Sequence, residues 1–332
     1  MTTALPTSIR TPDATSIAEA TALLRAGACI GLPTETVYGL AADACNDDAV
    51  AKVFAYKNRP DFNPLIVHVG SLEQAATLVD LPPIAHKLAE AFWPGPLTLV
   101  LDRTKDCPVS LLASAGLATL AIRMPAHRVA RQLLQESDLC LAAPSANPSG
   151  RISPTTAHHV ASQLNLPMVL DGGPCDVGLE STILRVDGDK LTLLRPGGLA
   201  MEEIEAACGT PVQALEKPSK ITAPGQLLSH YAPSKPVRLN AATVGANEAL
   251  LAFGTPLTGT KTCLNLSPKE DLTEAAANLF AMLHALDGKT CSGIAVMPIP
   301  ETGLGQAIND RLRRAAAPQG IRRGMDHARD AK

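Results

Sequence analysis

Short apolar runs alternate with helix-like stretches through the first two thirds of the chain, and this alternation constrains the fold most strongly. The runs are rich in Leu, Val and Ile and too short for buried helices, so they indicate buried strands. We predict strands at residues 28–32, 65–69, 97–101, 117–122, 139–143, 181–186 and 191–194, and helices at residues 15–26, 47–56, 72–79, 83–92, 126–135 and 154–163. Because some neighbours are joined by helical crossovers and others by tight turns, we expect an α/β fold with a mixed, twisted sheet and helices.

The C-terminal part of the chain predicts a second, smaller α/β domain. Residues 216–236 contain four prolines and almost no periodicity, which is typical of an extended linker. The alternation then restarts, with strands predicted at residues 237–239, 249–253 and 293–297 and helices at residues 272–286 and 305–316. We therefore predict domains at residues 1–215 and 237–332, separated by a linker at residues 216–236, and a Rossmann-like parallel sheet in the second domain.

The composition excludes several classes of protein. Hydrophobic residues make up 46% of the chain but aromatic residues only 3%, so base stacking on aromatic side chains is poorly supported. A formal net charge of -3 gives no general attraction to polyanions. The eight cysteines are scattered, with no C-x-x-C pair and no zinc-like cluster, as expected for reduced thiols. No apolar run approaches the roughly 20 residues that span a bilayer, so we expect a cytoplasmic protein with no membrane association.

The stretch GLPTETVYG at residues 31–39 follows a predicted buried strand and carries unusually many hydrogen-bonding side chains. Thr34, Glu35, Thr36 and Tyr38 lie between a proline and a glycine. A polar surface turn would explain this pattern. A ligand pocket at the end of the strand would explain it equally well.

Paired cations follow one of the predicted helices. Lys57 and Arg59 stand two residues apart, so in an extended segment they share a face. Two cations on one face suit an anion with several oxygens, such as a phosphate chain, and a solvated basic turn is the alternative.

Similar polar residues occur at other strand ends. Arg123 and Thr119 lie on one side of an otherwise apolar strand, where a guanidinium needs either a structural carboxylate or the carboxylate of a ligand as its partner. Three further pairs or single residues flank strands: Ser145 with Asn147, Glu180 with Ser181, and Arg195. His68 lies inside a predicted strand, where a core histidine with satisfied hydrogen bonds is the more common case.

Together these strand ends predict one cavity lined by cations, hydroxyls and an amide. Such a lining suits a small polar molecule beside a nucleotide. The chain has no G-x-x-x-x-G-K-[ST] loop, no G-x-G-x-x-G turn, no G-x-S-x-G elbow and no H-E-x-x-H motif. Phosphates would therefore have to be held by side chains.

These motifs, in this order, resemble those of the YrdC-like threonylcarbamoyl-AMP synthases. The resemblance rests on PTETVYGL at residues 33–40, K-x-R at 57–59 with NPL at 63–65, S-x-N at 145–147, EST at 180–182 and LRPG at 194–197. The linker element SHYAP at residues 229–233 and the sequence GLGQAINDRLRR at residues 303–314 are similar to those of the longer, two-domain form.

The resemblance implies a YrdC-like catalytic first domain and a nucleotidyltransferase that converts L-threonine, bicarbonate or CO2, and ATP to threonylcarbamoyl-adenylate and pyrophosphate. A separate complex would then transfer the threonylcarbamoyl group to an adenosine of tRNA. Threonine would be bound by Thr36, His68, Arg123, Ser145 and Ser181. ATP would be bound by Lys57, Arg59, Asn63, Thr119, Asn147, Ser153, Arg195 and the linker residue Tyr231.

The implied chemistry needs charge stabilisation and protection from water. The amine of threonine adds to CO2 to give a short-lived carbamate, which a closed pocket would protect. The carbamate then attacks the α-phosphate, and Lys57 and Arg59, as the catalytic cations, would offset charge on the leaving pyrophosphate together with Arg195 and Mg2+. We expect Mg2+ to be held mainly by the ATP phosphates and not by protein side chains.

The linker is expected to act as a lid as well as a tether. Its prolines would keep it extended over the pocket mouth while His230 and Tyr231 point inward. On this hypothesis, replacing Tyr231 with Ala should impair turnover far more than folding. The C-terminal domain shows no catalytic motif, and we expect it to serve lid control or assembly.

Two other functions are compatible with parts of the sequence. A protein of the same fold could bind RNA through a concave basic surface without forming an adenylate, and steeply salt-dependent RNA binding without ATP turnover would identify it. A carbamoyltransferase of the hydrogenase-maturation type contains a similar domain, but its acylphosphatase and zinc-finger segments are not found in this sequence.

Overall fold

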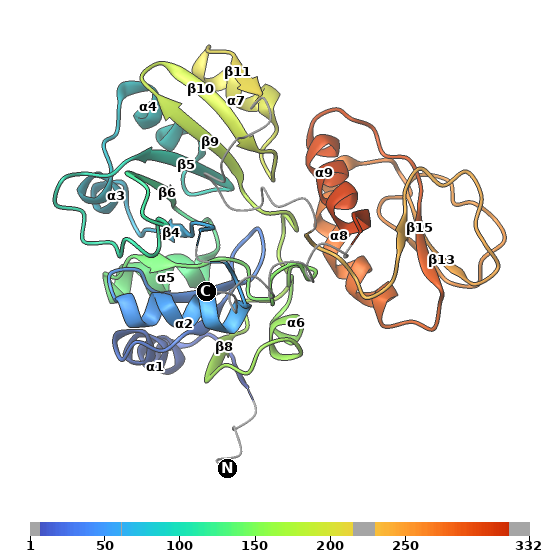
Figure 1. The fold of residues 1–332 in the computed structure, drawn as a ribbon, viewed down its shortest axis with the longest axis horizontal. Coiled ribbons are helices and arrows are strands. Elements are labelled where there is room, and N and C mark those ends of the chain that lie inside the picture. The colour runs from blue at the N-terminus through green and yellow to red at the C-terminus, as the bar shows by residue number, and fades with distance from the viewer. Residues whose placement is uncertain (1–6, 61, 215–229, 319–332) are drawn as a thin grey trace, which may run out of the picture.

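The computed structural model describes residues 7–60, 62–214 and 230–318 (Figure 1). Within these ranges the strands form an eleven-stranded sheet, in the order β1-β8-β2-β3-β7-β4-β6-β5-β9-β10-β11, and a four-stranded sheet in the order β12-β15-β13-β14. The first sheet contains both parallel and antiparallel pairs, whereas all pairs of the second sheet are parallel. The predicted fold class, a mixed α/β sheet followed by a small parallel sheet, is confirmed.

The strands of the first sheet are β1 (Ser8–Arg10), β2 (Ile30–Leu32), β3 (Gly39–Asp43), β4 (Ile66–His68), β5 (Leu97–Asp102), β6 (Thr119–Arg123), β7 (Leu141–Ala142), β8 (Met168–Leu170), β9 (Thr182–Asp187), β10 (Lys190–Arg195) and β11 (Val212–Ala214). Its helices are α1 (Ala14–Arg25), α2 (Asp47–Lys57), α3 (Leu72–Leu78), α4 (Pro83–Phe92), α5 (Arg128–Ser137), α6 (Ala157–Ala161) and α7 (Met201–Cys208). The second sheet contains β12 (Val237–Arg238), β13 (Glu248–Ala252), β14 (Cys263–Asn265) and β15 (Gly293–Val296), with α8 (Leu272–Asp287) and α9 (Leu304–Ala316).

Six of these elements were not predicted from the sequence: β1, β3, β8, β11, β14 and α7. They are short, and β3, with the sequence GLAAD, consists of residues with low strand propensity. Pairing with β2 on one side and β7 on the other holds β3 in the sheet. Tertiary pairing therefore decides its conformation.

The two faces of the first sheet are covered differently. One face, which carries Val67, is packed under α2, α3 and α4 in the largest apolar cluster. The other face is covered by α1 and α5 over β2, β3 and β8. Over β4, β6, β5 and β9 this second face carries only a small apolar cluster formed by Ile66, Val100, Ala121 and Ile183. This part of the sheet is where a ligand can approach.

The second sheet and its helices, residues 237–316, are called here the C-terminal unit. Its helices α8 and α9 lie on the side that faces the first sheet (Figure 1). Leu179 and Tyr231 join the apolar cluster of these helices. Gly178 has a φ of +69°, and a Cβ there would lie 2.5 Å from the backbone oxygens of Ala276 and Ala277, so only glycine permits this close approach of α8.

Candidate functional site

A hollow lies over the uncovered part of the sheet. It is lined by Thr34, Thr36, Val37, Arg59, Ile66, His68, Arg123, Ala143, Pro144, Ser145, Glu180, Ser181, Arg195, His230 and Tyr231. Ile66 and His68 are two residues apart on β4, so the hollow lies against one face of the sheet and not along one edge. Eight of the thirteen residues expected to bind substrate are among the lining residues: Thr36, Arg59, His68, Arg123, Ser145, Ser181, Arg195 and Tyr231.

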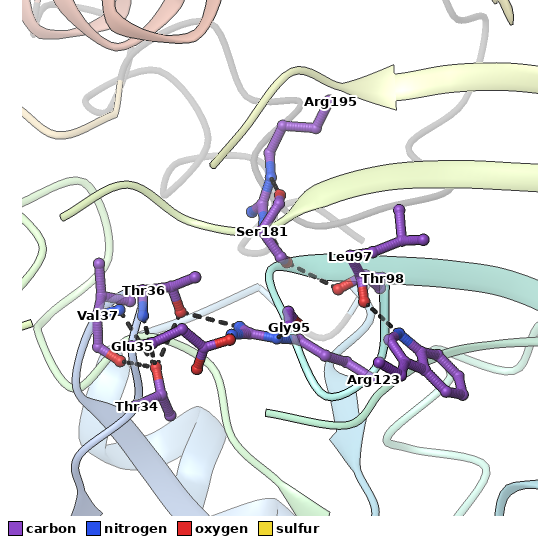
Figure 2. A network of polar contacts seen from close by, with 11 residues as sticks. Thr34, Glu35, Thr36, Val37, Gly95, Leu97, Thr98, Arg123, Ser181 and Arg195 are labelled. Carbon is purple, nitrogen blue, oxygen red and sulfur yellow. Dashed lines mark hydrogen bonds and ion pairs between the residues drawn. The ribbon is translucent and has the colours of Figure 1, made fainter. Parts of the chain in front are cut away.

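Thr34 and Thr36, in the loop between β2 and β3, form a directed chain of hydrogen bonds with Arg123 (Figure 2). The hydroxyl of Thr34 donates to the backbone oxygen of Val37 at 2.6 Å. It therefore accepts from the hydroxyl of Thr36 at 2.8 Å, and the Thr36 oxygen in turn accepts from Nη1 of Arg123 at 2.8 Å. The polar stretch at residues 31–39 is thus part of the hollow and not a surface turn.

Arg123 also forms an ion pair with Glu35, and both side chains are almost fully buried. Its Nε donates to the backbone oxygen of Gly95 at 3.0 Å. The sequence left two possible partners for this guanidinium, a structural carboxylate and the carboxylate of a ligand, and it has room for both. The structural carboxylate is Glu35, and within the described chain these bonds use three of the five N–H donors, so two are left for the carboxylate of a ligand.

Ser181 and Arg195 form a second polar group, drawn above Arg123 in the close-up (Figure 2). Nη2 of Arg195 donates to the backbone oxygen of Ser181 at 2.8 Å and to its Oγ at 3.1 Å. The Ser181 hydroxyl also shares a hydrogen bond of 2.7 Å with Thr98. Burial lowers the pKa of Arg195 to about 10, with Tyr231 opposing and Arg311 adding to the shift.

Lys57 and Arg59 are fixed by backbone oxygens. Nζ of Lys57 donates to the backbone oxygens of Ser145 and, at 2.6 Å, Asn147. Arg59 donates to the backbone oxygens of Asn63 at 3.1 Å and Pro64 at 2.9 Å. Burial and then repulsion by Arg59 hold the pKa of Lys57 well below its usual range. The pKa of Arg59 is lowered to about 10, mainly by burial. Tyr231 opposes this shift and repulsion by Arg195 adds to it. An anion in the hollow would relieve this repulsion.

Five of the expected residues are not in the lining. Four of them are bonded to lining residues or to each other. Lys57 donates to the backbone oxygens of Ser145 and Asn147, and Asn63 accepts from Arg59. Ser153 donates from its Oγ to Glu180 at 2.6 Å. The carboxamide oxygens of Asn63 and Asn147 are buried and have no hydrogen-bond partner among the described residues. Thr119 lies at the start of β6 on the same face as Arg123, on the far side of Ala121.

His68 is not a histidine with satisfied hydrogen bonds. It lines the hollow, and its Nδ1 is buried without a partner in the described part of the chain. Burial and then the neighbouring Arg123 lower its pKa to about 3, so the ring is neutral at neutral pH. A neutral ring nitrogen can donate or accept a hydrogen bond from a ligand.

Several residues of the site were not assigned a binding role from the sequence. Thr34, Glu180 and His230 line the hollow, and Glu35 holds Arg123. The sequence could have indicated all four, because each is a polar residue in a motif that the sequence analysis describes. Thr98 lies inside an apolar run, and only its place opposite Ser181 explains why a hydroxyl is buried there. Tyr38 is not part of the hollow, since its hydroxyl donates to the backbone oxygen of Gly173 at 2.7 Å.

His230 and Tyr231 belong to the linker that the sequence predicts. Both line the hollow, and Tyr231 is only 1% exposed. The enclosed part of the hollow has a volume of about 50 Å³, which is room for a few water molecules. Tyr231 has a φ of +62°, a left-handed conformation that costs an aromatic residue roughly 1–2 kcal/mol. Residues 216–229 of the linker lie outside the described residues.

No group of three or more His, Cys, Asp or Glu side chains in the described ranges is arranged to hold a metal ion. All eight cysteines are free thiols. Among the described helices, none combines the length and apolar character that crossing a membrane requires.

Models of known protein families match most of the chain in two consecutive parts. A family model described as telomere recombination, for Sua5, YciO and YrdC proteins, matches residues 22–197. A second model, the C-terminal domain of threonylcarbamoyl-AMP synthase, matches residues 199–317.

Two relatives are similar over nearly their full lengths. The threonylcarbamoyl-AMP synthase of Bacillus subtilis is 40% identical, over 92% of this chain and 94% of the relative. That of Pyrococcus abyssi is 38% identical, over 90% of this chain and 93% of the relative. The crystal structure of P. abyssi Sua5 complexed with L-threonine superposes with a TM-score of 0.86 at 35% identity, covering 95% of this chain and 98% of that one. The chain therefore belongs to the Sua5/YrdC family of threonylcarbamoyl-AMP synthases, in the form that carries the C-terminal domain.

Proposed function

We infer that the protein is an L-threonylcarbamoyladenylate synthase. In this reaction L-threonine, bicarbonate or CO2, and ATP give threonylcarbamoyl-AMP and pyrophosphate. The observation that carries the inference is that Arg123, Arg59 and Arg195 meet in one hollow, and that two N–H donors of Arg123 have no partner among the described residues. The first suits the carboxylate of an amino acid, and the other two suit a polyphosphate. The similarity to named synthases over most of the chain supports the same reaction.

We propose that threonine binds at the end of the hollow formed by Arg123, Thr36, His68, Ser145 and Ser181. Its carboxylate would accept from the two remaining N–H donors of Arg123. The Nδ1 of His68, which has no partner among the described residues, would bond the threonine hydroxyl or the carbamate. Neutral His68 suits this role because it adds no second cation beside Arg123.

ATP is proposed to bind on the side of Lys57, Arg59 and Arg195, with Asn63, Asn147, Ser153, Thr119 and Tyr231 as further contacts. The small apolar cluster of Ile66, Val100, Ala121 and Ile183 includes the β6 residue between Thr119 and Arg123, and it would give the adenine an apolar surface. The unpartnered carboxamide oxygens of Asn63 and Asn147 can accept from the nucleotide. Charge on the departing pyrophosphate would be stabilised by the same cations.

Mg2+ is proposed to enter with ATP, bound to its phosphates. The two carboxylates nearest the substrates, Glu35 and Glu180, are already paired with Arg123 and Arg311. No protein side chain is therefore assigned to the metal. The downstream partner, a complex that transfers the threonylcarbamoyl group to tRNA, and action in the cytoplasm are also part of this proposal.

The domain boundaries are proposed at residues 1–215 and 237–332, with the linker at residues 216–236. Strand β11 ends at Ala214 and pairs with β10, which supports keeping it in the first domain. We propose that the linker acts as a lid, and the presence of its residues His230 and Tyr231 in the lining of the hollow supports this.

Binding of an RNA backbone is the less favoured alternative. Three of the four basic side chains that would have to face the phosphates are buried: Lys57 is 2% exposed, Arg123 is 3% and Arg195 is 4%, and Arg59 is partly exposed. Side chains at this depth suit a small ligand and not a duplex or a folded RNA surface.

The test is pyrophosphate release by the purified protein, with threonine, bicarbonate or ATP omitted in turn. We expect release only when all three are present, together with a product whose mass is that of threonylcarbamoyl-AMP. Release that continues without threonine and bicarbonate would show simple ATP hydrolysis and would overturn the proposed function.

A further inference from the structure

The sequence GLGQAINDRLRR near the C-terminus matches the two-domain form of the family, but the reaction assigns it no role. In the structure this segment is α9, on the side of the C-terminal unit that faces the first sheet (Figure 1). Its Arg311 is 0% exposed, although arginine is among the residues that are least often fully buried. A buried guanidinium requires partners that offset its charge.

The main partner of Arg311 is a residue of the hollow. Nε donates to Oε2 of Glu180 at 2.8 Å, across 131 residues of sequence. Nη1 donates to the backbone oxygen of Pro196 and to Asp310. The other carboxylate oxygen of Glu180 accepts from Ser153 at 2.6 Å. Glu180 is therefore fixed from both sides, with Arg311 supplying the only positive charge in direct contact with it among the described residues.

Arg311 also contacts Tyr231, a residue of the predicted linker that lines the hollow. Its guanidinium carbon lies 5.3 Å from the centroid of the Tyr231 ring, a cation–π arrangement. The ring of Tyr231 also packs against Phe280 of α8, with ring centroids 5.5 Å apart. One side chain of the C-terminal unit thus touches both the carboxylate of the hollow and its lid.

The charge of Glu180 matters because of what the hollow has to hold. Glu180 lines it together with Arg195 and Arg59. A carboxylate without a partner at this position would pair with one of these cations and would repel the phosphates of a nucleotide. Burial raises the pKa of Glu180, but Arg311, Arg195 and Ser153 more than offset this, so the group is charged at neutral pH.

We propose that Arg311 is a positioning residue through which the C-terminal unit completes the nucleotide side of the site. By pairing with Glu180, it keeps this carboxylate from pairing with the cations that line the hollow, and by contacting Tyr231 it holds that ring in place. This inference rests on the proposed function, because it assumes that ATP binds beside Arg195. An interdomain ion pair with a purely structural role is the alternative.

Steady-state kinetics of Arg311→Met, alone and combined with Glu180→Gln, distinguish the positioning role from a purely structural one. The single variant leaves Glu180 charged and unpaired, so we expect KM for ATP to rise at least tenfold while KM for threonine changes less than threefold. Adding Glu180→Gln removes the charge that needed Arg311, so the double variant should recover KM for ATP to within about threefold of wild type. Arg313→Met, on the same helix with an exposed ion pair to Glu301, is the matched control and should behave as wild type.

A purely structural role predicts a different result. Arg311→Met would then reduce kcat with equal changes in both KM values, Glu180→Gln would give no recovery, and the inference would be overturned. If Arg311→Met does not fold, Arg311→Lys with and without Glu180→Gln replaces it, with the same expected pattern at smaller amplitude.

Direct ATP binding by calorimetry distinguishes a failure of this inference from a failure of the proposed function. Wild-type protein that binds no ATP would overturn the proposed function and this inference with it. Wild-type protein that binds ATP, with Arg311→Met binding it equally well, would overturn only the role of Arg311.

Discussion

Arg123 forms a buried ion pair with Glu35 inside the hollow that is proposed to bind threonine. The same guanidinium is expected to receive the carboxylate of the substrate, so two carboxylates would share one cation. Repulsion between them weakens binding of the second one.

Replacing Glu35 with Gln should therefore tighten threonine binding. Gln keeps an oxygen that accepts from Arg123 but carries no charge. In the protein without ligand, the guanidinium of Arg123 would then be a buried charge without a counter-ion, and the carboxylate of threonine would supply one. We expect the dissociation constant for threonine to fall by roughly threefold to tenfold. Threonine should also raise the melting temperature of this variant more than that of wild type. Weaker threonine binding would show that Glu35 has another role in the site.

The three cations Lys57, Arg59 and Arg195 should be stabilised by a polyanion. Their pKa values are all lowered by burial, and the two arginines also feel repulsion from other guanidinium groups. We expect ATP or inorganic triphosphate to raise the melting temperature, and AMP to raise it less. In Arg59→Gln this difference between triphosphate and AMP should become smaller. Equal shifts with AMP and triphosphate in the wild-type protein would argue against a phosphate site here.

Tyr231 requires a more careful test than replacement by Ala. The ring is buried against Phe280 and Arg311, so Tyr231→Ala should cost about 3–5 kcal/mol of stability in addition to any effect on turnover. This differs from the expectation that folding would be little affected. Tyr231→Phe keeps the ring contacts, and we expect it to retain stability within about 1 kcal/mol and most of the turnover. Equal loss of turnover in both variants, measured where both are folded, would assign the role to the hydroxyl instead.

Acid should destabilise the protein through its buried histidines. Burial lowers the pKa of His68 to about 3 and, with His284 adding to the shift, that of His159 to about 4. Both lie below the value of about 6.5 in the unfolded chain, so the unfolded state binds more protons between these limits. Stability is therefore complete above about pH 6.5 and falls as the pH drops toward 4, by up to about 1.4 kcal/mol per pH unit for each fully buried histidine.

The stacked pair His159 and His284, with ring centroids 4.1 Å apart, offers a specific test of this pH dependence. His284 donates from Nε2 to the backbone oxygen of Ser153 at 3.1 Å, so the pair joins the C-terminal unit to the first sheet. His159 is partly exposed, and His159→Gln should reduce the loss of unfolding free energy between pH 7 and pH 5 by up to about 1 kcal/mol. Urea denaturation at the two pH values measures it, and an unchanged loss would assign the acid sensitivity to other groups.

The sequence by itself determined the class of the fold and the types of residue in the site. Short apolar runs with helical crossovers predict a mixed α/β sheet because side-chain periodicity depends only on local backbone geometry. Lys57 and Arg59 were predicted from the sequence because two cations on one face suit a phosphate chain, and Arg195 because it follows a predicted buried strand. The linker is predicted from its prolines.

Only the tertiary structure decided which of these residues meet. The pairing order of the first sheet brings Thr98 against Ser181, gives β3 its conformation and leaves one part of one face open for the hollow. It also places Arg311 on Glu180 and Glu35 on Arg123. These contacts join residues far apart in the sequence, and their formation depends on how whole strands and helices pack, which no local pattern of side chains contains.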